Sequence, residues 1–248
     1  AEAAFLEVEK LGLHTENVWT ITIALTELAA LARFRGDLTK ALTLCEKAMR
    51  EVRERGAYEM GSVSKVELIW ADLLRERGDF DSAREHLNHG VEILADWDNP
   101  NDSLHRYTVV AKLALTQERL TEAEEAIRGG RELLETHVVM PWIQARFEQV
   151  EIRWQLLSED LEECRQWLDA HIANPAPSTR VRELERLTAT RIRIALGDFR
   201  DVLPTLDELD VEDCSGRQIE IAILRVLCHA SEGDRTEALT ALNHALEL

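Results

Sequence analysis

The sequence predicts an all-α protein, a right-handed superhelical solenoid of helix–turn–helix repeats with about six helix pairs and one preceding helix. Two observations lead to this fold class. Apolar residues recur with the 3.6-residue period of an amphipathic helix along most of the chain. A short turn signal, clearest at Gly78-Asp79 and followed by Ala83, separates these runs. Glycine can adopt the left-handed conformation that ends a helix, and aspartate caps the N-terminus of the next helix.

The turn signal occurs six times along the chain. Its copies begin at Gly36, Gly78, Glu118, Glu159, Gly197 and Gly233. Successive copies are separated by 42, 40, 41, 38 and 36 residues. A nearly constant spacing of this length is typical of stacked helix hairpins, so each copy should mark the turn of one repeat.

Small residues flank the first three turns, seven positions before the turn and five and twelve positions after it. They are Ala29, Ala41 and Ala48, then Ala71, Ala83 and Gly90, then Ala111, Ala123 and Gly130. This pattern resembles the packing signature of tetratricopeptide repeats, whose period of about 34 residues is slightly shorter. The last three repeats keep the turn but have Ile152, Thr190 and Val226 at the first small position.

The helices are expected in the following order. A single helix spans Ala1–Leu11, and pairs follow at Asn17–Arg35 with Leu38–Arg55, Glu59–Arg77 with Phe80–Asp96, and Asp102–Glu118 with Thr121–His137. Three more pairs span Pro141–Leu157 with Leu161–Ile172, Arg180–Leu196 with Val202–Leu209, and Gly216–Ser231 with Thr236–Leu248.

The prolines agree with these helices. Pro141 begins a helix, where its missing N–H costs no hydrogen bond, and Pro100, Pro175 and Pro177 are expected in loops between repeats. Pro204 is tolerated only within the first turn of its helix, so that helix should be short or displaced.

We expect residues 1–248 to form a single solenoid domain. The proline-rich stretch Asn174–Ser178 indicates a long loop near residues 173–179, because repeats continue on both sides of it. The chain begins without Met inside one predicted helix and stops inside another. We therefore expect it to be a fragment of a longer chain.

The composition indicates which partners the chain is expected to bind and where in the cell it is expected to lie. The net charge is −18, from 29 basic and 47 acidic residues, which disfavours attraction to nucleic acid or to an anionic membrane. No apolar run approaches the roughly 20 residues that a membrane span requires. The four cysteines lack the spacing of metal ligands, and three occupy apolar helix positions. They are expected to be reduced core residues of a cytoplasmic protein.

No catalytic motif is found, and we expect neither an enzyme nor a bound cofactor or metal in this segment. Phosphate-binding loops, dinucleotide-binding glycine motifs and metalloprotease motifs are all absent from the sequence. His86 and His89 share one helix face but lack a third ligand, so they are expected to be ordinary surface residues.

One charge pattern indicates a binding surface. The first helices of such repeats line a concave groove, and the positions 13, 10, 6 and 3 residues before each turn should point into it. These positions hold seven basic residues and two acidic ones, whereas the remainder of the chain holds 22 basic and 45 acidic residues. The candidate ligand- or partner-binding residues are Lys65, Arg75, Lys112, Arg146, Gln149, Arg153, Arg191 and Glu220. The pattern favours an anionic ligand or an acidic segment. Alternatively, these arginines pair with carboxylates and brace adjacent repeats.

The order of features resembles the tetratricopeptide-like region of MalT-like bacterial transcription regulators, which are LuxR-type and ATP-dependent. The matching stretches are Ser103–Tyr107, Pro141–Glu148, Cys164–Leu168, Arg182–Arg191 and Gln218–Leu224. The chain departs from the family pattern at Glu118-Arg119 and Glu159-Asp160, where Gly-Asp is usual.

The resemblance implies an effector-sensing region between a nucleotide-binding module and a helix-turn-helix domain. A small-molecule effector or a peptide or protein partner would bind in the groove and control self-association and transcription activation. ATP would bind in the upstream module, and this segment would contact neither nucleic acid nor membrane. The alternative is a general tetratricopeptide scaffold that binds an acidic peptide or protein and has no transcriptional role.

Overall fold

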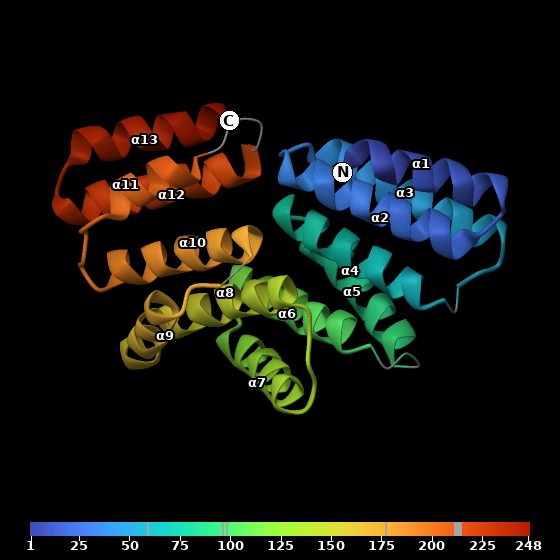
Figure 1. Ribbon diagram of the computed structural model, residues 1–248, viewed down its shortest axis with the longest axis horizontal. Coiled ribbons are helices and arrows are strands. Elements are labelled where there is room, and N and C mark those ends of the chain that lie inside the picture. The colour runs from blue at the N-terminus through green and yellow to red at the C-terminus, as the bar shows by residue number, and fades with distance from the viewer. Residues whose placement is uncertain (59, 96, 98, 177, 211–214) are drawn as a thin grey trace. The chain divides into compact units, whose positions relative to one another are not determined.

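A computed structural model describes residues 1–58, 60–95, 97, 99–176, 178–210 and 215–248. Over these residues the chain is all-α, with thirteen helices and no strand (Figure 1). The first seven helices are α1 (Glu2–His14), α2 (Val18–Phe34), α3 (Leu38–Glu54), α4 (Gly61–Glu76), α5 (Phe80–Leu94), α6 (Pro100–Thr116) and α7 (Leu120–Thr136). The other six are α8 (Pro141–Leu157), α9 (Leu161–Ala173), α10 (Thr179–Ala195), α11 (Val202–Leu209), α12 (Ser215–Glu232) and α13 (Arg235–Glu247). The predicted all-α solenoid of helix pairs is confirmed.

The predicted turn chemistry is present at most turns. The glycines that begin four of the turns all have a positive φ, 78° in the case of Gly78. The side chain of Asp79 then accepts a hydrogen bond from the main-chain N–H of Ser82 and so caps α5. Asp37, Asp160 and Asp234 cap α3, α9 and α13 in the same way. At the fifth turn the aspartate does not cap a helix, because α11 begins later, after Asp201.

Glu118 and Glu159 occupy the two turns where glycine is missing, and they adopt the left-handed conformation with φ of 58° and 59°. This conformation costs a non-glycine residue about 1–2 kcal/mol. We expect Glu118→Gly to raise the free energy of unfolding by about 0.5–1 kcal/mol, since the greater freedom of unfolded glycine offsets part of the relief. Urea unfolding should measure the change. The matched control is Glu125→Gly on the exposed face of α7, which should lower stability by about 0.5–1 kcal/mol; equal effects of the two variants would contradict the prediction.

The described residues form two compact units, residues 1–139 and residues 140–248. The expectation of one continuous solenoid domain stays a prediction. In the first unit the first helices α2, α4 and α6 pack against one another in sequence, and the second helices α3, α5 and α7 each pack on their own partner. In the part of the chain that the structure describes, the backbones of α3, α5 and α7 do not approach one another. The first helices therefore form the continuous layer of this unit.

The small-residue signature is buried where the helices of the first unit meet. All nine of its alanines and glycines are buried. At Gly90, an added Cβ would lie 3.1 Å from Cβ of Glu67 and 3.3 Å from the main-chain oxygen of Ser64, so α5 approaches α4 closely there. The predicted packing role of these small residues is confirmed.

In the second unit, α10 packs against α8 on one side and α12 on the other. The short helix α11 contacts both α10 and α12. Leu187, Val202, Leu206 and Leu224 are among the buried residues that fill the space between α10, α11 and α12. α10 is thus the central helix of this unit.

The prolines follow the predictions with one correction. Pro141 begins α8, and Pro204 lies in the first turn of the eight-residue helix α11. Pro100 was expected in a loop but is the first residue of α6, because Asn99 caps that helix two residues earlier than predicted. Pro175 lies in the loop after α9, and Pro177 falls outside the described residues.

The cysteines that the structure describes are buried and unbonded: Cys45, Cys164 and Cys228. Burial raises the pKa of the Cys45 thiol to about 12, which keeps it protonated and unreactive near neutral pH. Cys214 falls outside the described residues. Among the helices that the structure describes, none is both long and apolar enough to cross a membrane.

Candidate ligand-binding site

The eight candidate residues all lie on first helices of the repeats. Lys65 and Arg75 belong to α4 and Lys112 to α6 in the first unit. In the second unit α8 carries Arg146, Gln149 and Arg153, α10 carries Arg191, and α12 carries Glu220. Spacings of three and four residues keep neighbouring candidates on one face of a helix. The two units therefore hold two separate sets of candidates.

Two of the three candidates of the first unit, Arg75 and Lys112, contact one buried carboxylate. Asp72 is 1% exposed. Its two oxygens lie 2.9 Å from Nη2 of Arg33, 2.8 Å from Nε of Arg75 and 3.0 Å from Nζ of Lys112. Glu76 adds a second acid, 2.5 Å from Arg33 and 3.2 Å from Arg75. We call these five residues the Asp72 cluster.

The Asp72 cluster joins three consecutive repeats. Arg33 comes from α2, Asp72 from α4 and Lys112 from α6. Burial disfavours the charged form of Asp72, but the three cations outweigh it and hold the pKa of Asp72 well below its usual range. Lys65 adds a further link between repeats, since its Nζ lies 2.7 Å from Oε1 of Glu27 on α2. In this unit the charges of the predicted groove act as inter-repeat braces.

The candidates of the second unit form a smaller group around Glu220. One oxygen of Glu220, Oε1, accepts hydrogen bonds from Nη2 of Arg153 at 3.1 Å and from Nη2 of Arg191 at 3.0 Å. Helices α8, α10 and α12 are joined by these two ion pairs. Gln149 lies one turn before Arg153 on the same face of α8. We call Gln149, Arg153, Arg191 and Glu220 the Glu220 cluster.

Two buried nitrogens of the Glu220 cluster have no hydrogen-bond partner among the described residues. They are Nε2 of Gln149 and Nη1 of Arg191. A buried donor without an acceptor typically costs 1–3 kcal/mol, so such a group calls for a specific explanation. In contrast to the Asp72 cluster, this cluster offers donors that a bound ligand could satisfy.

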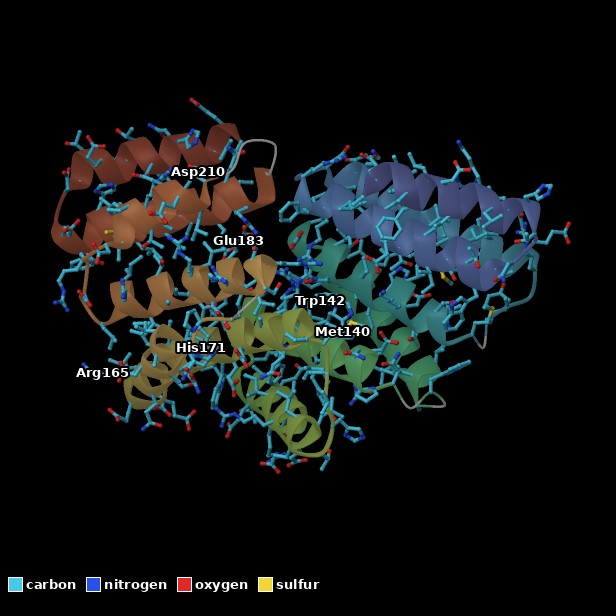
Figure 2. All side chains as sticks on the ribbon, in the orientation of Figure 1. Met140, Trp142, Arg165, His171, Glu183 and Asp210 are labelled. Carbon is cyan, nitrogen blue, oxygen red and sulfur yellow. The ribbon has the colours of Figure 1, made fainter. Side chains whose placement is uncertain are left out.

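Arg146 lies near the start of α8, beside an aromatic ring. Its guanidinium carbon is 5.3 Å from the centroid of the Trp142 ring, and that of Arg180 on α10 is 4.6 Å from the same ring. Figure 2 labels Trp142 near the start of α8 and Glu183 on α10. Glu183 pairs with Arg217 of α12 at 2.8 Å. The beginnings of α8, α10 and α12 are thus also joined by charged side chains.

Protonation of Glu220 should weaken the second unit. Burial disfavours the charge of Glu220, but Arg191 and Arg153 outweigh burial and lower its pKa. A glutamate whose pKa is lower in the folded state than in the unfolded state stabilises the fold. This stabilisation is complete at pH values above the unfolded-state pKa of about 4.3, and it is lost as pH falls through the folded-state pKa. We expect Glu220→Gln to be less stable than the unsubstituted chain at pH 7, and the gap to close as pH falls below about 4. Urea unfolding across this range would test this, and a gap independent of pH would contradict it.

The two histidines that could have held a metal share one carboxylate. Nδ1 of His86 lies 2.5 Å and Nδ1 of His89 lies 2.9 Å from the two oxygens of Glu67. His86 also stacks on Trp70, with ring centroids 4.1 Å apart. Over the described ranges no group of three or more His, Cys, Asp or Glu side chains has an arrangement that could hold a metal ion.

A family model described as the MalT-like TPR region matches the whole chain, residues 1–248. The chain belongs to this family. The resemblance inferred from the sequence is confirmed, and the repeat region is one of a kind that mediates interactions. No curated protein sequence matches this MalT-like TPR region. Among solved structures it is similar to nearly identical TPR-like repeats of a Podospora anserina protein described as a kinesin light chain. The sequence identity is 16%, the match covers 90% of this chain and 92% of that chain, and the TM-score is 0.43.

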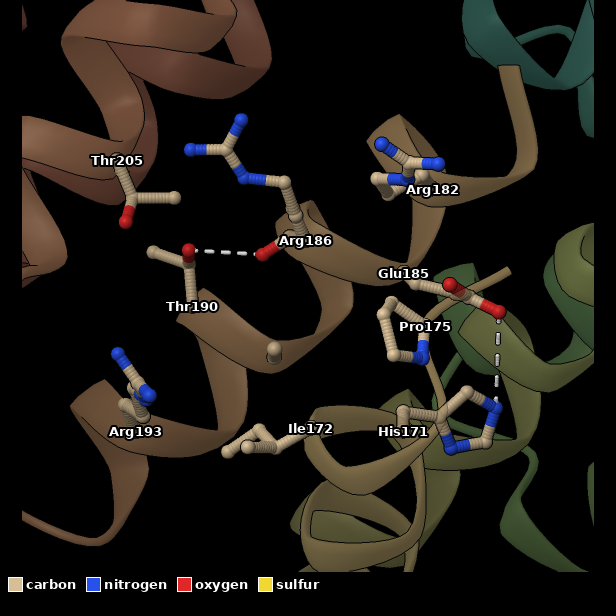
Figure 3. Close-up of a pocket in the computed structure, with 10 residues that line it drawn as sticks. His171, Ile172, Pro175, Arg182, Glu185, Arg186, Thr190, Arg193 and Thr205 are labelled. Carbon is tan, nitrogen blue, oxygen red and sulfur yellow. Dashed lines mark hydrogen bonds and ion pairs between the residues drawn. The ribbon is translucent and has the colours of Figure 1, made fainter. Parts of the chain in front are cut away.

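The MalT-like TPR region also contains a pocket that was not predicted from the sequence. It has a volume of about 230 Å³ and lies in the second unit, between the end of α9, the face of α10 and the short helix α11. Three arginines of α10 line it (Figure 3): Arg182, Arg186 and Arg193. Their spacing of four and seven residues, which places them on one stripe of a helix, is visible in the sequence. They were missed because they lie outside the positions assigned to the groove. We call this the arginine pocket.

Proposed function

We propose that this chain is the effector-sensing region of a bacterial LuxR-type, ATP-dependent transcription regulator, and that the effector binds at the Glu220 cluster. Its two buried donors without partners, on Gln149 and Arg191, support this site most directly. Membership in the MalT-like TPR family supports the regulator role.

The chemistry of the cluster favours an effector that carries a carboxylate or another strong acceptor. Arg153 and Arg191 share a single oxygen of Glu220. A ligand carboxylate beside this pair would accept from the unpartnered nitrogens of Gln149 and Arg191. Because the donors come from α8 and α10, binding would favour the arrangement of these helices that holds the ligand, which is a shift in conformational population.

The alternative role is a general scaffold for an acidic peptide, without a transcriptional function. The two roles differ in the neighbouring gene sequence. A regulator should have a phosphate-binding loop upstream and a helix-turn-helix downstream in the same reading frame. If both were absent, the regulator role would be wrong and the scaffold role would remain.

A thermal-shift screen would test the site. The probes are succinate, citrate and a glutamate-rich peptide, each compared with the neutral disaccharide trehalose. A ligand that binds the native state raises the melting temperature by mass action. We expect an organic acid to raise it and Gln149→Met to abolish the rise. A rise that survives in Gln149→Met would place binding elsewhere, and a rise with the peptide alone would favour the scaffold role.

A further inference from the structure

The wall of the arginine pocket combines cations and a hydroxyl from two helices. Arg186 and Arg193 lie on α10, about two turns apart, and Thr190 lies between them. Thr205 on α11 lines the pocket as well, and Figure 3 shows it beside Arg186 and Thr190. The hydroxyl of Thr190 donates to the main-chain oxygen of Arg186 at 2.8 Å, which leaves Thr205 as the hydroxyl donor for a ligand.

Arg186 and Arg193 are held only weakly by their present hydrogen-bond partners. Nη1 of Arg193 donates to the main-chain oxygen of Arg200 at 3.4 Å, a neutral acceptor at the edge of hydrogen-bonding distance. Nη2 of Arg186 pairs with Glu208 at 2.5 Å, but the side chain of Glu208 is 68% exposed. Exposed pairs of this kind contribute little to stability, so a ligand can replace them at small cost.

The carboxylates near the pocket are held by other groups. Glu185 lines the pocket, but its Oε2 accepts from the main-chain N–H of Ala176 at 3.0 Å, and its Oε1 lies 3.9 Å from Nε2 of His171. Asp198 is paired with Arg200 at 2.8 Å. The hydrogen bond from Arg200 lowers the pKa of Asp198, and the nearby charge of Arg193 adds to this effect. Three arginines and one glutamate line the pocket, on a chain whose net charge is −18.

The arrangement suits a tetrahedral oxyanion better than a planar one. A carboxylate offers two oxygens in one plane, which match the fork of a single guanidinium. Here the guanidinium groups of Arg186 and Arg193 come from different turns of α10 and the hydroxyl of Thr205 comes from α11, and all three residues line the pocket. A phosphate group presents oxygens in three directions and can accept from all three donors at once.

The rest of the pocket adds an apolar side and space for a small ligand body. Ile172, Pro175 and Ala189 supply an apolar side. The volume of about 230 Å³ equals roughly seven or eight water molecules at about 30 Å³ each. This leaves room for a phosphate group and a body of a few carbon atoms.

We propose that the arginine pocket binds a small phosphate monoester, with the phosphate on Arg186, Arg193 and Thr205 and the carbon body on the apolar side. The pocket uses a different stripe of α10 from Arg191 of the Glu220 cluster, so this proposal does not depend on the proposed effector site. A ligand there would join α10 to α11 through its phosphate.

Isothermal titration calorimetry on the full 248-residue chain tests the proposal. The probes are glycerol 3-phosphate, inorganic phosphate, glycerol and succinate. We expect glycerol 3-phosphate to bind, inorganic phosphate to bind more weakly, and glycerol not to bind. Inorganic phosphate as tight as the ester would overturn the role of the apolar side, and succinate as tight as the ester would overturn the phosphate assignment.

Matched variants separate the pocket from general charge effects. Arg186→Gln and Arg193→Gln should each weaken binding of glycerol 3-phosphate at least tenfold, because each removes a charge-assisted hydrogen bond. Arg165→Gln removes one positive charge from the exposed face of α9 and should leave binding within twofold. Ala189→Leu keeps all charges but fills the pocket, and it should also abolish binding. Circular dichroism confirms that each variant is folded. If the pocket variants bind as Arg165→Gln does, or if no probe binds the unsubstituted chain, the proposal is wrong.

Discussion

Asp72→Asn should lower the free energy of unfolding by about 3–5 kcal/mol, the largest effect we expect from any single substitution in the chain. The variant is nearly isosteric, so the loss arises from charge and not from packing. It leaves Arg33, Arg75 and Lys112 around a site whose carboxylate was 1% exposed. Glu76 would then be the remaining acid of the cluster, and its contacts there are with Arg33 and Arg75.

Urea unfolding, followed by circular dichroism, measures this change. Glu85→Gln on the exposed face of α5 is the control and should change stability by less than about 0.5 kcal/mol. The double variant Asp72→Asn with Lys112→Met should recover part of the loss, because it removes one of the three cations that Asp72 contacts. A loss below 1 kcal/mol for Asp72→Asn would mean that the cluster does not brace the repeats.

Gln149→Met should raise the free energy of unfolding by about 1–2 kcal/mol, although it deletes a polar side chain from the middle of α8. The amide nitrogen of Gln149 is buried without a partner, and Met fills nearly the same volume without that cost. Replacement of a glutamine that stabilises the fold should instead lower the free energy of unfolding. Increased stability together with a lost thermal-shift response would therefore indicate that this donor serves a ligand.

Gln144→Met on the same helix is the matched control for this prediction. Gln144 is exposed and donates to Glu148 at 2.8 Å, so its replacement should change stability by less than about 0.5 kcal/mol. Chemical unfolding of both variants without added ligand gives the comparison. A destabilised Gln149→Met would show that the amide is an internal structural contact and would count against the proposed effector site.

The sequence predicted the helices well because their boundaries depend on local chemistry. α8 and α11 have the predicted bounds, and both contain a proline that limits where a helix can begin. Even the turn at Glu118 could be located, because the spacing of repeats marked the position although glycine was missing. The start of α6 was misplaced by two residues, since a proline after Asn99 is equally compatible with a loop.

The candidate site was predicted less completely, for a physical reason. The spacing of the repeats placed Arg75 and Lys112 on the groove face, but their pairing with Asp72 depends on how closely adjacent helices approach. The alternative interpretation, a set of braces, describes the first unit. The unpartnered donor of Gln149 could not be foreseen, because it results from what surrounding helices fail to supply. The arginine pocket required the position of α11, which no repeat pattern specifies.

The packing of the first unit should make it easier to bend in one direction than in others. The layer of first helices holds buried apolar side chains and the buried charge of Asp72, both of which are poorly screened by salt. The second helices α5 and α7 are joined by the pair of Arg84 and Glu122, at 2.8 Å, whose side chains are 33% and 32% exposed. Salt weakens such a pair first. The unit should thus bend most easily by a motion that moves its second helices apart, while the layer of first helices acts as the hinge. This bending should become easier as ionic strength rises.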